Sequence, residues 1–247
     1  MIVQACLNGG RSRDDHPATP ITADELARDA AACVWHGARS LHVHPRGDDG
    51  AETLRAEHVD DAVRAIRARC PGVEISVTTG LWICDGDVEA RMAQIDAWTV
   101  LPHLCSVNVG EEGWAELADQ LLSRGVGLEL GVVSVDEARA YLESPLAGRA
   151  VRVLVEVPQR APEDAVAVAE AIDALLADAA PPYVPRLWHG EEEATWDVLV
   201  AAAQRGRDVR IGLEDVLTHV PPETRAVRDN AELVEVVVEG LLLPAEV

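Results

Sequence analysis

Short apolar runs of strand length alternate along the chain with longer stretches in which apolar residues recur every three or four positions. The short runs predict eight strands, at about Ile2–Leu7, Ser40–His44, Val73–Thr79, Leu104–Val109, Val126–Val132, Val151–Val157, Val184–Trp188 and Val209–Leu213. Helices are predicted between and after them, at about Thr22–His36, Glu57–Arg69, Asp87–Trp98, Trp114–Ser123, from Ser134 onward, Glu163–Asp178, Glu192–Arg205 and Asn230–Glu239.

Eight strand–helix units in this length predict one (β/α)8 TIM-barrel domain spanning residues 1–247. The strands are almost continuously apolar, which is typical of parallel strands covered on both faces. A doubly wound open sheet is the alternative fold. It would require a G-x-G-x-x-G sequence after the first strand, and Asn8-Gly9-Gly10 does not match that pattern.

The composition narrows the class of protein. A net charge of −22 argues against nucleic acid or an anionic membrane as a partner. No run of 18 apolar residues is present, and the N-terminus begins as a strand without the features of a signal peptide. Five cysteines without a pairing motif indicate a reducing compartment, so we expect a cytoplasmic location. All 21 basic residues are arginine, which excludes Schiff-base chemistry on a lysine.

A candidate metal site begins with His42 and His44, which share one face of a predicted strand. A His-x-His pair alone is more often structural than metal-binding. Closure of the barrel would place strand eight beside strand one, and so bring Glu214 near the histidines. Two imidazoles and one carboxylate leave a position open, as in catalytic zinc sites. Two alternatives remain open: the same three ligands could bind iron, or His189 could replace Glu214 as the third ligand.

Asp215, which follows the predicted ligand Glu214 directly, is a candidate general base oriented by Arg210. A helix cap or a surface ion pair is the alternative role for Asp215. Arg210 lies on the predicted last strand and should point inward, where a guanidinium requires a carboxylate partner. Glu191–Glu193 is interpreted as the solvated first turn of a helix.

The segment Thr78-Thr79-Gly80 offers two hydroxyl groups and accessible backbone N–H groups at the end of the third strand. Such a loop can hold a carboxylate or an oxyanion. A plain turn is the alternative.

Taken together, the chain resembles the β-keto acid cleavage enzyme family, whose first characterised member is 3-keto-5-aminohexanoate cleavage enzyme. The matching segments occur in order along the chain: Asn8–Gly10, Leu41–Arg46, Val77–Gly80, Ser106–Asn108 and Val209–Asp215. The resemblance implies one zinc ion per chain bound by His42, His44 and Glu214. It implies that Asp215 works with Arg210 as the base and that the hydroxyl of Thr78 binds the keto acid. Thr79, Gly80, Asn108 and Arg11 complete the candidate substrate-binding set.

The resemblance also implies a reaction: Claisen-type condensation and cleavage of a β-keto acid with acetyl-CoA, with acetoacetyl-CoA and a new acyl-CoA as expected products. A homodimer or homotetramer is expected by the same analogy. Arg11 falls near a position where amine-binding members carry a glutamate, so we expect an acidic or neutral tail on the substrate, unless Arg11 faces solvent or pairs with Asp14 or Asp15. A metal-dependent hydrolase, an aldolase and a binding or scaffold barrel without activity are the rival hypotheses.

Overall fold

Eight parallel strands close into a barrel in which each strand pairs with its neighbour in the sequence, and β8 pairs with β1. The computed structural model describes residues 1–158, 161–179, 184–223 and 225–242, so residues 243–247 of the expected domain lie outside the described residues. The strands are β1 Val3–Cys6, β2 Ser40–Val43, β3 Glu74–Val77, β4 Leu104–Asn108, β5 Gly127–Val132, β6 Arg152–Val157, β7 Arg186–Gly190 and β8 Asp208–Ile211. The predicted TIM barrel is confirmed.

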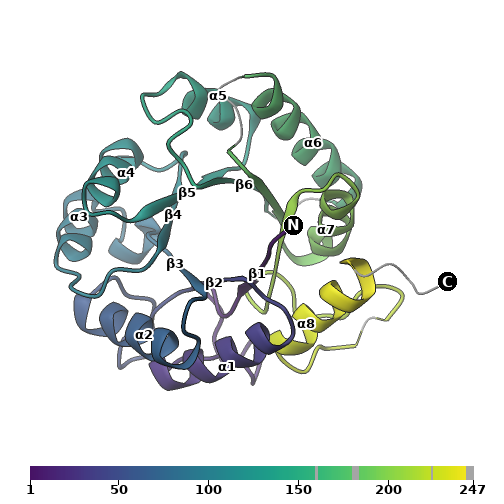
Figure 1. Cartoon of the computed structure of the whole chain (residues 1–247), viewed down its shortest axis with the longest axis horizontal. Coiled ribbons are helices and arrows are strands. Elements are labelled where there is room, and N and C mark those ends of the chain that lie inside the picture. Colours follow the sequence, from purple (N-terminus) through teal and green to yellow (C-terminus); the bar gives the residue numbers. More distant parts are fainter. Residues whose placement is uncertain (159–160, 180–183, 224, 243–247) are drawn as a thin grey trace.

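Helices surround the strands on the outside of the barrel (Figure 1). They are α1 Ala23–Trp35, α2 Ala56–Arg69, α3 Val88–Asp96, α4 Trp114–Ser123, α5 Val135–Glu143, α6 Pro162–Asp178, α7 Thr195–Gln204 and α8 Asn230–Val237. Short turns of other helix types add η1 Leu81–Cys84, η2 Glu192–Ala194 and η3 Val238–Leu242. Within the described residues, no helix combines the length and apolar character needed to cross a membrane.

Two helix starts follow the sequence signals closely. The Thr22 side chain accepts a hydrogen bond from the backbone N–H of Glu25, and the Glu25 carboxylate accepts one from the backbone N–H of Thr22. This reciprocal pair satisfies two N–H groups that the first turn of α1 would otherwise leave free. Ser134 caps α5 by accepting from the N–H of Glu137.

The strand register fixes which residues meet at the barrel mouth. Gln4 of β1 lies opposite Arg210 of β8, and Cys6 of β1 lies opposite His42 of β2. The strands β8, β1 and β2 are therefore consecutive, as barrel closure requires. Several strands end earlier than predicted, since β3 ends at Val77 and β8 at Ile211. The segments 78–80 and 212–215 consequently form loops at the C-terminal mouth, where TIM-barrel active sites lie.

Candidate active site

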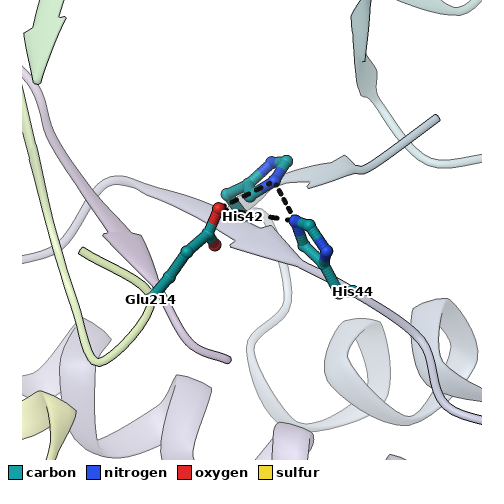
Figure 2. Close-up of side chains that lie close together, drawn as sticks. All are labelled: His42, His44 and Glu214. Atoms are coloured by element: carbon teal, nitrogen blue, oxygen red, sulfur yellow. Dashed lines mark hydrogen bonds and ion pairs between the residues drawn. The ribbon is translucent and has the colours of Figure 1, made fainter. Parts of the chain in front are cut away.

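His42, His44 and Glu214 come together at the barrel mouth, from the end of β2 and the loop after β8 (Figure 2). The two histidine Nε2 atoms are 3.0 Å apart. Glu214 Oε1 lies 3.4 Å from Nε2 of His44 and 3.9 Å from Nε2 of His42. Zinc–ligand bonds of 2.0–2.2 Å in tetrahedral geometry imply ligand separations of about 3.3–3.6 Å. One observed separation, 3.4 Å, lies within this range, and the other two, 3.0 and 3.9 Å, lie just below and just above it. The trio therefore fits a tetrahedral divalent ion.

The loop after β1 shapes this trio. The Asn8 side chain donates to the backbone carbonyl of His44 at 2.8 Å and accepts from the His44 N–H at 2.9 Å. Gly9 has φ +49°, and a Cβ on it would overlap the side chain of Glu214. Any larger residue at position 9 would therefore displace the carboxylate, which explains why asparagine and glycine stand in this loop.

The ring of His44 is held from behind by Glu52, which lies in the loop between β2 and α2. Glu52 Oε1 is 2.5 Å from His44 Nδ1, and the indole N–H of Trp82 donates to Glu52 Oε2 at 3.2 Å. A carboxylate only accepts, so the proton of neutral His44 is on Nδ1 and the lone pair of Nε2 faces Glu214. A carboxylate behind a ligating histidine orients the ring and raises its basicity.

His42 is oriented through a serine instead. Its Nδ1 lies 3.2 Å from Ser76 Oγ, and Ser76 in turn donates to Glu129, which is fully buried inside the barrel. Because the serine hydroxyl donates to the carboxylate, it accepts from His42 Nδ1–H and leaves Nε2 free. Two Nε2 lone pairs then face each other at 3.0 Å, an arrangement that requires a proton or a metal ion between them.

The two neighbouring carboxyl groups of Glu214 and Asp215 differ in their proton affinity. Burial raises the pKa of Glu214, but Arg210 and the two histidines outweigh burial and hold it well below its usual range. Burial also raises the pKa of Asp215, and there Arg210 offsets only part of the effect. Environments that separate two carboxyl pKa values assign them different roles. Glu214 is suited to hold a cation, and Asp215 to accept a proton.

Arg210 connects these carboxylates to a cavity of about 400 Å³ beside the trio. Its Nε and Nη2 donate to Asp215 Oδ1 at 3.1 and 3.0 Å, and Nη2 also donates to Glu214 Oε1 at 2.6 Å. The arginine lines the cavity, whereas Asp215 is fully buried behind it. The inward guanidinium thus has the carboxylate partners that its burial requires.

The predicted substrate-binding residues divide into two groups. Arg11, Thr78 and Asn108 line the cavity. Thr79 does not, because its hydroxyl donates to the carbonyl of Ser106. Gly80 does not either, because Trp82 packs over it and leaves no room for a side chain.

Arg11 does not pair with Asp14 or Asp15. Its guanidinium forms an ion pair with Glu192 and donates to the carbonyl of Leu213 at 3.2 Å. The charge of Arg11 is therefore balanced within the protein, which weakens the case that it selects an acidic substrate tail.

Several residues of the site are absent from the sequence-based set. Glu52 carries no local signal, because it lies in a loop and contacts His44 only after folding. Ser76 shares a strand face with Thr78, so alternation could have identified it. Glu191 and Glu192 were expected in a solvated helix turn; instead both line the cavity, and α7 begins only at Thr195.

Comparison of the sequence with models of known protein families identifies the family of this chain. The family model described as BKACE, beta-keto acid cleavage enzyme, matches residues 1–242. The chain belongs to the β-keto acid cleavage enzyme family. The resemblance drawn from the five motifs is thereby confirmed, and membership favours it over the hydrolase and scaffold hypotheses.

Individual relatives match over shorter stretches. A protein of Fusobacterium nucleatum subsp. nucleatum named 3-keto-5-aminohexanoate cleavage enzyme is 38% identical over 81 residues, which are 32% of this chain and 30% of that relative. A Cupriavidus necator protein named 3-oxoadipate:acetyl-CoA acetyltransferase is 31% identical over 80 residues, 32% of this chain and 28% of the relative.

The apo structure of ObcA superposes with a TM-score of 0.74 at 18% identity, over 92% of this chain and 62% of ObcA. At this identity the likeness shows the shared barrel fold. The chain matches less than two thirds of the length of each of these three proteins.

Proposed function

We propose that the protein is a zinc-dependent enzyme that exchanges acyl groups between a β-keto acid and acetyl-CoA. The observation that carries the proposal is that the His42–His44–Glu214 trio lines the same cavity as Arg210, which is hydrogen-bonded to the buried Asp215. Family membership supplies the reaction class, and the names of the two relatives indicate keto acids and acetyl-CoA as the reactants.

Mass balance sets the products. A new C–C bond joins the carbon between the keto and carboxylate groups to the acetyl carbon, and the CoA thiolate leaves. The thiolate then attacks the keto carbonyl, and the bond from that carbonyl to the same carbon breaks. One CoA enters and one leaves, so the products are acetoacetate and a new acyl-CoA. One CoA cannot give two thioesters, so the expectation of acetoacetyl-CoA together with a new acyl-CoA is wrong.

Different side chains are suited to bind the metal ion and the keto acid. His42, His44 and Glu214 would hold the ion, which when bound polarises the keto oxygen and stabilises the enolate. Thr78 lines the same cavity, where its hydroxyl would donate a hydrogen bond to the keto acid. Zinc is the ion we favour, because two neutral imidazoles and one carboxylate with an open position form a catalytic zinc ligand set.

The base acts through an intermediary. Asp215 is fully buried and does not line the cavity, whereas Arg210 touches both the cavity and Asp215. We infer that the guanidinium takes a proton from the substrate carbon as it passes one of its own to Asp215. Burial raises the pKa of Asp215, which favours acceptance of a proton there. Burial lowers the pKa of Arg210, but Asp215 and Glu214 outweigh burial and raise it well above its usual range, so the guanidinium can give up a proton only as it gains the one from the substrate.

Two further expectations belong to this proposal. The protein is proposed to work in the cytoplasm as a homodimer or homotetramer. Trp35 on α1 is 87% exposed and is the first candidate for a subunit contact. Light scattering should give a mass of at least twice 26.5 kDa. A monomer at micromolar concentration would exclude the oligomer without affecting the proposed reaction.

The reaction is tested by incubating zinc-loaded protein with acetyl-CoA and a panel of β-keto acids. Mass spectrometry should detect acetoacetate and the acyl-CoA that corresponds to each reactive keto acid. Release of free CoA and acetate alone would instead indicate a hydrolase, and would contradict the proposal.

A further inference from the structure

The barrel closes at the seam between β1 and β8, and the candidate metal ligands depend on both sides of this seam. The backbone of His44 is held by Asn8, which follows β1, whereas Glu214 lies in the loop after β8. The last pair in the register of the two strands is Ala5 with Ile211. The position of Glu214 relative to the histidine therefore depends on how the two strand ends are held together beyond this pair.

Asn230, the first residue of α8, bridges these strand ends. Its side-chain oxygen accepts a hydrogen bond from the backbone N–H of Leu213 at 2.7 Å, and its side-chain nitrogen donates to the backbone carbonyl of Leu7 at 2.8 Å. Two residues past the last pair, the same register would set Leu7 opposite Leu213. The carboxamide thus supplies hydrogen bonds to two backbone groups at the point where the regular ladder has ended.

The orientation of the Asn230 amide follows from a third contact. The side-chain nitrogen also donates at 2.6 Å to Asp29 of α1, the helix next to α8 (Figure 1). Asn230 is fully buried, and these contacts use its oxygen and both of its N–H groups. A flipped amide would place its nitrogen against the N–H of Leu213 and its oxygen against the carbonyl of Leu7. The observed orientation is the one that satisfies every group.

The bridge acts on two loops that pack tightly against each other at the candidate metal site. Leu213 directly precedes Glu214, and Leu7 lies two residues before Gly9, where a Cβ would overlap the Glu214 side chain. The direct backbone hydrogen bond between the loops, from the Glu214 N–H to the carbonyl of Cys6, is long at 3.4 Å. The shorter hydrogen bonds of Asn230 are therefore better placed to fix the spacing of the loops.

We propose that Asn230 is a positioning residue for the metal site, and that its bridge sets the distance of the Glu214 carboxylate from His42 and His44. The inference rests on the proposed function, because the ion concerned is the one proposed there. Glu214 Oε1 lies 3.4 and 3.9 Å from the two Nε2 atoms. A further shift of roughly 1 Å would carry it outside the separations that a tetrahedral ion allows.

The test compares variants of Asn230 by their affinity for zinc, measured against a chromophoric chelator at a temperature where circular dichroism shows each protein folded. Asn230→Leu keeps the branched shape and removes all three hydrogen bonds. Asn230→Asp keeps the acceptor for Leu213 but sets a second oxygen against the carbonyl of Leu7. Zinc affinity should fall about 10-fold in Asn230→Asp and about 100-fold in Asn230→Leu, the range for residues that orient metal ligands.

Val237→Ala is the matched control, because Val237 is fully buried at the other end of the same helix. It should lower the Tm without changing zinc affinity. Cobalt(II) gives a second measurement, since its visible absorption depends on its coordination geometry. The absorption spectrum of the cobalt-loaded protein should change in Asn230→Leu and stay as in the wild type in Val237→Ala.

Wild-type zinc affinity and cobalt spectrum in the Asn230 variants would overturn the inference, and so would an equal loss of affinity in Val237→Ala. If Asn230→Leu does not fold, the affinity of Asn230→Asp decides. A wild type that binds zinc but exchanges no acyl group would refute the proposed reaction and leave the affinities to decide on Asn230. A wild type that binds neither ion would overturn the inference together with the zinc site.

Discussion

Replacing Glu52 by glutamine tests how the site orients its ligands. The two carboxylate oxygens accept from different donors, His44 Nδ1–H and the Trp82 indole N–H. Glutamine has one acceptor and one donor, so one of the two contacts becomes a repulsive donor–donor pair. The preferred proton position on His44 is then no longer enforced.

Loss of a partner behind a metal-ligating histidine typically lowers metal affinity about 10- to 100-fold. For Glu52→Gln this corresponds to about 1.4–2.7 kcal/mol of zinc binding free energy. Zinc competition against a chromophoric chelator measures it directly. Glu57→Gln, whose side chain is 66% exposed on α2, is the control and should bind zinc as the wild type does.

A second substitution separates two effects of Glu52→Gln on His44: the lost orientation of its ring and the lost negative charge beside it. In Glu52→Gln combined with Trp82→Phe, the indole donor is gone, so the glutamine can turn its oxygen to His44 without conflict. The double variant should recover part of the lost affinity relative to Glu52→Gln alone. Wild-type zinc affinity in the single variant would refute the reasoning that Glu52 positions the ligand.

Three other predictions follow from the charged groups. Asp215→Asn should keep its zinc, measured by metal analysis, but lose about 10²- to 10⁴-fold in kcat, because the shape persists and the base is gone; near-normal turnover would move the base to Glu156 or His189. Burial lowers the pKa of His44, but Glu214 and Glu52 outweigh burial and raise it to about 9, so a proton competes with the metal below that pH, and chelator titrations should show zinc affinity rising with pH until about 9.

The third of these concerns stability. Burial raises the pKa of Asp29 from 3.8 to about 7. The folded state therefore binds more protons than the unfolded state between these values, and its stability falls as pH rises from about 4 to 7. Asp29→Asn removes this loss, so the Tm advantage of the variant over the wild type should widen from pH 4 to pH 7. A constant Tm difference would contradict the raised pKa.

The fold and the metal trio were predictable because they depend on periodic features. Strand alternation places His42 and His44 on one face, and eight repeated units require closure, which carries Glu214 to them. The family motifs added Arg210 and Asp215. These inferences need only the order of elements, not their detailed packing.

The rest of the site depends on loops, for which the sequence offers no period. Glu52 meets His44 through a loop after β2, and Glu191 faces the cavity because η2 intervenes before α7. Thr79 was assigned to the site although strand alternation alone separates it from Thr78. The ion pair of Arg11 with Glu192 joins residues 181 positions apart, which no local pattern can reveal.

The most direct test of the proposed reaction follows the acetyl carbons. Metal-stripped and zinc-reloaded protein should be incubated with a β-keto acid and acetyl-CoA labelled with carbon-13 in both acetyl carbons, and the products analysed by mass spectrometry. We predict that both labelled carbons appear in acetoacetate, that the new acyl-CoA carries none, and that zinc restores the reaction lost on stripping. Label found only in free acetate, or equal rates with and without metal, would contradict the proposed zinc-dependent acyl exchange.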